Sequence, residues 1–288
     1  MNNYYEEIMN LKEAEDLKPF VKRLETLSGN IKTAPPRSEI ILPNLLMVAR
    51  SGVGKTNLLK LLSEYIDSKG NLMSFYGDVK FFEFSLGYCQ PGETFKELLR
   101  LFDEVGFAAG FRNEFRGVIR IDIDEWINHF EEKHFIDFLE YLSANDEKWF
   151  IILSVTPTDK KKIHNLKAFL SMYMRIEEVS LSLPKTEELF DYIESTLSGY
   201  GLTLSEGGKK LLTETINKLR KNKNFDGFKS IKLLCQDIAY TFFSQEKIKD
   251  YIIDEEFLKF FAPESSYVKE TELKYDKVQK IGLIQKEN

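Results

Sequence analysis

The residues with the clearest chemical signature lie in one short stretch. Two glycines there would let the backbone turn with its N–H groups pointing inward, as phosphate binding requires. Lys55 could reach the β- and γ-phosphates, and the hydroxyl of Thr56 could ligate Mg²⁺. The stretch therefore predicts a P-loop that binds the phosphates of a nucleotide together with Mg²⁺. The predicted nucleotide-binding residues of this loop are Ser51, Gly52, Val53, Gly54, Lys55, Thr56 and Asn57.

The flanking sequence supplies the elements that a P-loop needs. An apolar run at residues 40–48, interrupted by Pro43 and Asn44, predicts a strand before the loop. Apolar residues after the loop share one helical face and predict a helix: Leu58, Leu59, Leu62 and Ile66. The loop departs from the usual pattern at Ala49, which stands where the first glycine is expected. Alanine is a modest steric change at a strand exit, so we expect the loop to form.

The second candidate group is Asp124-Glu125, which ends an apolar-biased strand within residues 117–126. In a P-loop enzyme, an aspartate beside the phosphate loop holds the Mg²⁺ shell and a glutamate polarises the attacking water. We assign the metal role to Asp124 and the base role to Glu125. Asp122 is a competing metal candidate, because it lies on the same strand face as Asp124.

A third candidate lies at the end of the most strongly β-like run, residues 149–158, which Pro157 terminates. A small polar side chain at such a strand end can reach the attacking water or the γ-phosphate. Thr156 is preferred over Ser154 for this role.

Composition bounds the class of protein. The chain has 288 residues and a formal net charge of −6, which argues against coating nucleic acid by charge alone. The two cysteines and three histidines lack the spacing of a disulfide framework or a metal site. The N-terminus has no signal-peptide pattern, and the apolar runs are too short to span a bilayer. We therefore expect a cytoplasmic protein without a membrane segment.

Strands alternate with helices as far as residue 183, and from Pro184 the pattern is helical only. Residues 4–29 read as helical, either as one helix kinked at Pro19 or as two. The other expected elements are strands at 79–86 and 179–183, helices at 94–105, 129–145 and 165–175, and a solvated loop at 160–162. This order predicts an α/β fold, a P-loop NTPase αβα sandwich with a parallel sheet, followed by a small all-helical lid.

Four segments follow from this order of elements: residues 1–36 as an N-terminal helix and linker, 37–183 as the nucleotide-binding domain, 184–262 as the lid, and 263–288 as a polar tail.

The order of these motifs resembles the AAA+ ATPases, in particular the group of stage V sporulation protein K and CbbX. The resemblance covers about residues 8–262. It rests on the loop at 49–56, Asp124-Glu125, Thr156 and the lid segment Asp226-Gly227-Phe228-Lys229-Ser230-Ile231-Lys232. It implies ATP and Mg²⁺ as cofactors, self-association into a ring, and a protein partner that is remodelled or assembled.

The resemblance also implies roles for further residues. Lys229 and Lys232 take the places of the two sensor 2 arginines, so Lys229 joins the predicted nucleotide-binding set. Met172 stands where the family has its arginine finger, and Arg175, three residues on, is the substitute that we expect to be catalytic. Arg112 and Arg116 are alternatives for that role. Tyr88 occupies the position of the pore-loop aromatic.

Three functions remain open from the sequence. The first is an ATP-driven remodeller of proteins, and the second is a slow, switch-like assembly or regulatory protein of a defence or signalling complex. The departures at Ala49 and Met172 favour the switch over an energetic motor. The third is a nucleic-acid-linked AAA+ regulator, with contacts at 160–162 and 218–223, which the net charge disfavours.

Overall fold

The computed structural model describes residues 3–11, 14–33, 42–73, 80–86, 117–144, 149–222, 225–246, 248 and 250–262. The chain divides into two compact units, residues 1–183 and 184–288. The predictions for the loop at 87–93 with Tyr88, the helix at 94–105, Arg112, Arg116 and the tail at 263–288 lie outside the described residues.

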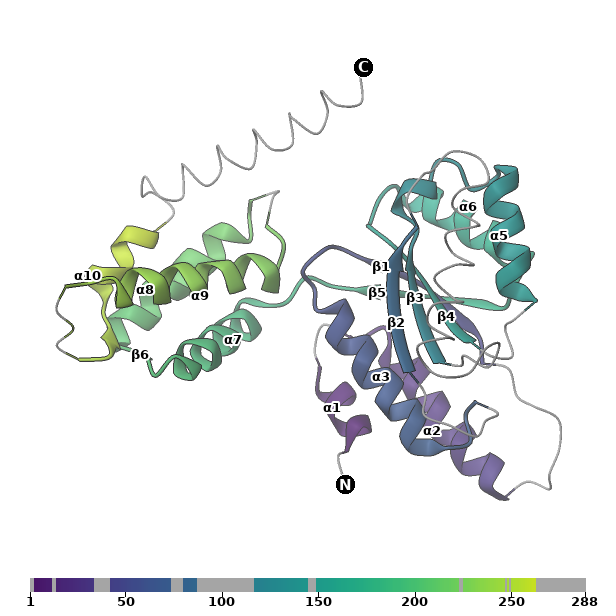
Figure 1. Cartoon of the computed structure of the whole chain (residues 1–288), viewed down its shortest axis with the longest axis horizontal. Helices are drawn as coiled ribbons and strands as arrows, with labels where there is room; N and C mark the ends of the chain where they lie inside the picture. Colours follow the sequence, from purple (N-terminus) through teal and green to yellow (C-terminus); the bar gives the residue numbers. More distant parts are fainter. Residues whose placement is uncertain are drawn as a thin grey trace, which may run out of the picture. The chain divides into compact units, whose positions relative to one another are not determined.

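The first unit contains a five-stranded parallel sheet with the order β2-β3-β4-β1-β5 (Figure 1). Its strands are β1 (Asn44–Ala49), β2 (Lys80–Ser85), β3 (Gly117–Asp122), β4 (Trp149–Val155) and β5 (Ile176–Leu181). The central strands β1 and β4 are buried along their whole length, which explains why they read as continuous apolar runs. Because all strands are parallel, their carboxyl ends meet at one edge of the sheet.

Helices cover both faces of this sheet (Figure 1). On one face lie α1 (Tyr4–Asn10), α2 (Lys18–Thr33) and α3 (Lys55–Lys69). On the other lie α5 (Lys133–Ser143) and α6 (Lys160–Leu170). Side chains alternate between the two faces of the sheet along β3. Val118 therefore packs on the α3 side, and Ile119 and Ile121 pack on the α5 side.

The N-terminal segment is two helices rather than one kinked helix. Pro19 is the second residue of α2, where its missing N–H costs no intrahelical hydrogen bond. The helix packs into the core through Phe20, whose ring stacks on Phe150 of β4 with centroids 5.6 Å apart. The helix is therefore part of the sandwich.

Several sequence-based boundaries were wrong. The helix expected at 129–145 begins only at Lys133, because turns with N–H to C=O hydrogen bonds occupy residues 127–132. The helix expected at 165–175 is α6, which includes the three lysines at 160–162. The Asp159 side chain caps it by accepting a hydrogen bond from the backbone N–H of Lys161. The strand expected at 179–183 begins three residues earlier, as β5.

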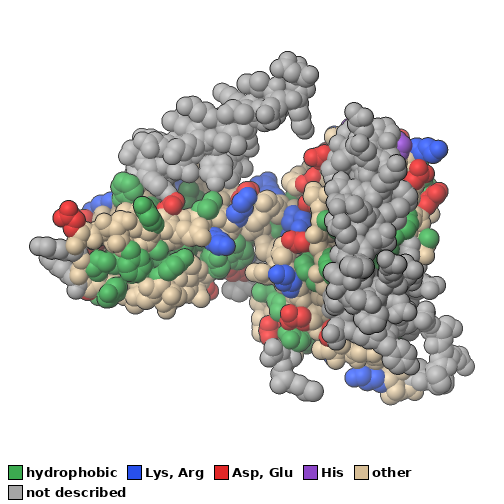
Figure 2. Space-filling view, viewed as in Figure 1, with side chains coloured by type: hydrophobic (Ala, Val, Ile, Leu, Met, Phe, Trp, Pro, Cys, Tyr) green, Lys and Arg blue, Asp and Glu red, His purple; other side chains and the backbone are tan. Residues whose placement is uncertain are grey.

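The second unit has its own core, built by α7 (Thr186–Gly199), α8 (Glu206–Leu219), α9 (Phe228–Phe243), α10 (Glu255–Leu258) and the 3-10 turn η2 (Lys259–Phe261). The purely helical prediction missed a short parallel pairing of β6 (Thr203–Leu204) with β7 (Ile252–Ile253). Hydrophobic side chains are visible on the surface of this unit (Figure 2). Tyr240 of α9 is 77% exposed.

No helix among the described ranges is long and apolar enough to cross a membrane. The predicted fold class is confirmed: the first unit is a P-loop αβα sandwich with a parallel sheet, and the second is a small helical lid domain.

Candidate nucleotide-binding site

The loop between β1 and α3 has the geometry of an anion cradle. Gly52 and Gly54 have φ values of 73° and 88°, in the left-handed region that glycine adopts without strain. Gly54 precedes the first residue of α3 and offers no side-chain cap, so the first N–H groups of the helix remain available to an anion. Val53, 1% exposed, anchors the loop in the core.

The alanine that replaces the first glycine fits this site. Ala49 is the last residue of β1, pairs with Leu181 of β5 and is fully buried among core side chains. Its methyl group therefore packs below the loop and leaves the cradle open.

The side chain of Lys55, the first residue of α3, reaches back to the start of the loop. Its Nζ donates a hydrogen bond to the carbonyl oxygen of Ala49 at 3.1 Å. Burial lowers the pKa of Lys55 below its ordinary value, and the nearby Arg120 guanidinium lowers it further. The carboxylates of Asp122, Asp124 and Glu83 act in the opposite direction. The ammonium is thus close to the acids at the carboxyl edge of the sheet.

The two acids assigned from the sequence lie just beyond β3. The strand ends at Asp122, and Asp124-Glu125 begin the 3-10 helix η1 (Asp124–Trp126). The expectation that the strand itself runs to Glu125 was wrong, because the backbone turns after Ile123 and the N–H of Trp126 bonds to the Ile123 carbonyl. Asp122 Oδ1 accepts a hydrogen bond from the backbone N–H of Asp124 at 3.1 Å, which fixes this turn.

Thr156 and Asp124 are brought together across β3 and β4. The Thr156 hydroxyl donates to Asp124 Oδ2 at 2.6 Å, and the backbone N–H of Thr156 donates to Oδ1. Ser154 is fully buried, and its Oγ accepts a hydrogen bond from Nε of Arg120. The two polar side chains at the end of β4 therefore have different partners, and Thr156 is the one joined to a predicted metal ligand.

Two residues of the cluster were missed from the sequence. The hydroxyl of Thr56 donates to both carboxylate oxygens of Glu83, at 2.9 and 3.1 Å, and Glu83 also pairs with Arg120. In the sequence, Glu83 stands between Phe82 and Phe84, and Arg120 stands between Ile119 and Ile121. A charged residue between apolar residues of a strand was the signal that could have identified both.

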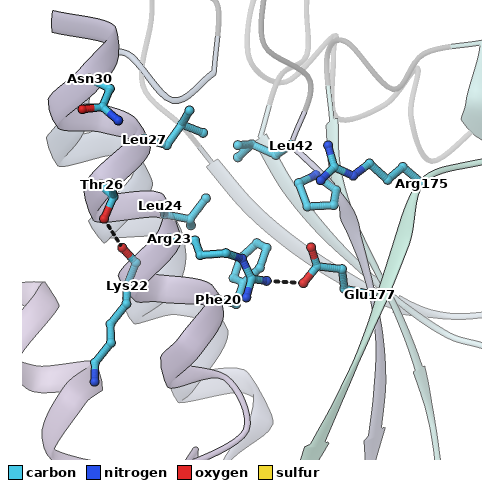
Figure 3. A pocket seen from close by; sticks show the side chains of 11 residues that line it. Phe20, Lys22, Arg23, Leu24, Thr26, Leu27, Asn30, Leu42, Arg175 and Glu177 are labelled. Atoms are coloured by element: carbon cyan, nitrogen blue, oxygen red, sulfur yellow. Dashed lines mark hydrogen bonds and ion pairs between the residues drawn. The ribbon is translucent and has the colours of Figure 1, made fainter.

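Arg175 lies at the amino ends of the strands, whereas the predicted phosphate loop lies at their carboxyl ends. It immediately precedes β5, and its carbonyl accepts a hydrogen bond from the N–H of Asn44 at the start of β1. Its exposed side chain lines a pocket of about 490 Å³ between α2 and β5, beside the ion pair of Arg23 and Glu177 (Figure 3). Met172 is 68% exposed at the end of α6. Arg175 is therefore separated from the loop of its own chain by the length of β5.

Lys229 and Lys232 are exposed residues in the first part of α9, in the second unit. The turn before this helix is fixed by a hydrogen bond from the backbone N–H of Asp226 to the hydroxyl of Ser230. The lysines are thus presented by an ordered helix start, and their role toward nucleotide remains a prediction.

The donor set of the first unit fits Mg²⁺. In the part of the chain that the structure describes, no three His, Cys, Asp or Glu residues are grouped as a metal cage. Mg²⁺ in nucleotide sites is usually held by one or two carboxylates together with phosphate oxygens and water. The hydroxyl of Thr56 with Asp122 or Asp124 supplies such hard oxygen ligands next to the phosphate cradle.

Fold and site together define the class: a P-loop αβα domain with strand order 2-3-4-1-5, followed by a helical lid, as in AAA+ proteins. No protein-family model matches the sequence, and no curated protein matches it. Among solved structures, the chain is similar to a proline-to-glycine mutant of Thermotoga maritima RuvB, with a TM-score of 0.52 and 15% identity over 88% of this chain and 70% of that chain.

A lysine-to-arginine mutant of the same protein gives a TM-score of 0.50 and 14% identity over 85% and 67% of the two chains. At these identities the likeness concerns the fold, and it agrees with the AAA+ resemblance without singling out the group of stage V sporulation protein K and CbbX.

Proposed function

We propose that this protein is an ATPase of the AAA+ type that binds and hydrolyses Mg-ATP. The observation that carries the proposal is the convergence of the glycine cradle, Lys55 and Thr56 with Asp122, Asp124 and Thr156 at the carboxyl edge of one parallel sheet. Ligands of open α/β sheets bind at this edge. The helix N-terminus and Lys55 would hold the phosphates, and Thr56 with an aspartate would hold Mg²⁺.

The remaining roles follow from position. Glu125, exposed on the turn after β3, would polarise the attacking water. Asp124 holds Thr156 in place through a hydrogen bond, so that the Thr156 hydroxyl could contact the γ-phosphate. Bound magnesium would neutralise charge on the phosphates. Lys55 and Lys229 would supply further positive charge, Lys229 from the lid.

We further propose that the active form is a ring that remodels or assembles a protein partner. Support comes from the AAA+ fold and from Arg175, whose exposed side chain lies at the sheet edge away from its own P-loop. An arginine in that position could act only on the nucleotide of a neighbouring copy. Such a trans arginine contributes orders of magnitude to the rate of phosphoryl transfer.

Nucleotide binding is tested by thermal unfolding with Mg-ATP. At about 100 times the Kd, a ligand that binds only the folded protein adds about 2.7 kcal/mol of stability. Lys55→Ala should abolish the shift, whereas Lys60→Ala, which changes an exposed lysine of the same helix, should preserve it. A wild-type protein without a shift, or an equal shift in Lys55→Ala, would refute the P-loop assignment.

Assembly is tested by measuring the particle mass with and without ATP, using Glu125→Gln to trap the ATP state. Proteins that co-purify with Glu125→Gln, and are absent from Lys55→Ala preparations, are candidate partners. A monomer under all conditions would contradict the ring.

The switch-like function remains a second candidate because of a specific observation. Met172, exposed just after α6, stands where the AAA+ resemblance places an arginine. ATP-dependent assembly with negligible turnover would favour the switch, and rapid turnover would favour the motor. DNA affinity that falls steeply with salt would instead favour the nucleic-acid-linked regulator.

A further inference from the structure

A row of charged and polar residues crosses the face of the sheet that α3 covers. Glu83 of β2 is opposite Arg120 of β3, and Asp122 of β3 is opposite Ser154 of β4. Further down the same strands, this face carries only core side chains, such as Val118 and Ile152. The charged row lies at the carboxyl ends of the strands, beneath the first turn of α3.

Arg120 is the centre of this row, and its side chain is only 12% exposed. Its Nη1 lies 3.3 Å from Glu83, its Nη2 lies 3.0 Å from Asp122, and its Nε donates to Ser154 at 3.0 Å. The Arg120 guanidinium places a positive charge within the acidic cluster. Its planar fork presents donors in fixed directions to both carboxylates and to Ser154, a geometry that the compact ammonium of a lysine does not fix.

The two carboxylates that contact Arg120 also belong to the predicted metal site: Glu83 contacts the predicted ligand Thr56, and Asp122 is itself a candidate ligand. Glu83 accepts the hydrogen of the Thr56 hydroxyl, which leaves the oxygen lone pairs of Thr56 free to face a cation. Asp122 is a candidate metal ligand, and one of its oxygens is already bound to Arg120. Glu83 therefore orients Thr56, and Arg120 neutralises the charge that would attract a divalent cation.

We propose that Arg120 is a built-in competitor of Mg²⁺: its guanidinium holds Glu83 and Asp122 until a divalent cation takes its place, so that Arg120 and Glu83 set the Mg²⁺ concentration at which this site fills. Both are positioning residues. Arg120 acts through the two carboxylates, and Glu83 acts through the Thr56 hydroxyl. This inference rests on the proposed nucleotide site for its biological meaning, although cation binding itself can be measured without nucleotide.

The direct test uses the full-length protein and MgCl₂ alone. The melting temperature is followed against MgCl₂ concentration at constant ionic strength for the wild type and Arg120→Gln. Removing a close positive charge should lower the Mg²⁺ concentration of half-maximal effect by at least about tenfold. Arg23→Gln is the matched control, because it removes an ion-paired arginine of α2 whose partner, Glu177, lies on β5, at the other side of the sheet from β2. Equal midpoints for Arg120→Gln and wild type would overturn the proposal.

A second variant keeps the test valid if Arg120→Gln does not fold. Glu83→Gln removes a carboxylate but can still accept the Thr56 hydrogen bond. Binding of a fluorescent ADP analogue should then require several-fold more Mg²⁺, while its metal-free affinity changes little. An unaltered Mg²⁺ requirement would overturn the role of Glu83. Failure of the wild type to bind any nucleotide would refute the proposed function, whereas the response of Arg120→Gln to MgCl₂ would still decide the present inference.

Discussion

Thr156 donates two hydrogen bonds to the carboxylate of Asp124, one from its hydroxyl and one from its backbone N–H, across the ends of two adjacent strands. Strand β4 thereby fixes the orientation of an acid that lies on the turn after β3. The pair joins a predicted metal ligand to a residue that was predicted to reach the γ-phosphate.

Replacing Thr156 by valine keeps the side-chain shape and the backbone donor but removes the hydroxyl. We expect nucleotide affinity to change by less than about threefold and turnover to fall by at least about tenfold, because the lost group positions reacting atoms rather than binding phosphate. Steady-state ATPase assays and nucleotide titration measure the two effects. Thr158→Val, in the exposed segment that follows β4, is the control. Wild-type turnover in Thr156→Val would contradict this role.

Lys55→Met should make the nucleotide-free protein more stable at neutral pH. Burial lowers the pKa of Lys55 in the folded state, so the unfolded chain binds the proton more tightly. Protonated Lys55 therefore lowers the free energy of unfolding of the wild type. This loss of stability disappears as pH rises from the folded pKa toward the unfolded pKa of about 10.5.

Melting temperatures of the wild type and Lys55→Met from pH 7 to 11 measure this effect. The advantage of the variant should shrink toward the top of the range, and its Mg-ATP shift should be absent at every pH. A variant that is less stable than the wild type at pH 7 would contradict the buried, destabilised ammonium.

Arg175→Ala and Glu125→Gln should each be inactive alone and should regain activity when mixed. Ala49 pairs with Leu181, six residues after Arg175, so about 20 Å of strand separates this arginine from its own loop. In an equal random mixture, about a quarter of the interfaces combine an intact Glu125 with an intact Arg175. ATPase activity near that fraction of the wild type is expected.

A mixture that stays inactive although the variants co-assemble would exclude Arg175 as a trans arginine. Wild-type turnover of Arg175→Ala alone would exclude it in any role. Lys167→Ala, which breaks an exposed ion pair with Glu178, controls for general disturbance of the α6–β5 surface.

Phe20→Ala should destabilise the first unit by about 3–5 kcal/mol, the usual cost of emptying a buried aromatic site. The Phe20 ring is 3% exposed and lies nearly parallel to that of Phe150. Both tryptophans of the chain, Trp126 and Trp149, are in the first unit, so tryptophan fluorescence during urea unfolding reports on this unit alone. Phe243→Ala, in the second unit, should leave that transition unchanged. A negligible effect of Phe20→Ala would mean that α2 is dispensable for the sandwich.

The local parts of this protein were determined by its sequence. The positive φ values at Gly52 and Gly54 need glycine, and the helical periodicity after Lys55 needs no distant partner, so strand, loop and helix were predicted together. The alternation of strands and helices likewise predicted the parallel sandwich, because it depends on residue types a few positions apart. Boundaries were less accurate, as the early start of α6 illustrates, since one capping hydrogen bond at Asp159 decides it.

Only the tertiary structure decided which side chains share the site. Glu83 meets Thr56 because α3 lies over the face of β2 that Glu83 occupies, although 27 residues separate them in the chain. Arg120 meets Glu83 because β2 and β3 pair in one register, and a shift of one residue would turn Arg120 to the other face. Strand order and register arise from packing of the whole sheet. For that reason, the sequence predicted the phosphate loop, whereas the charges around Thr56 were visible only in the fold.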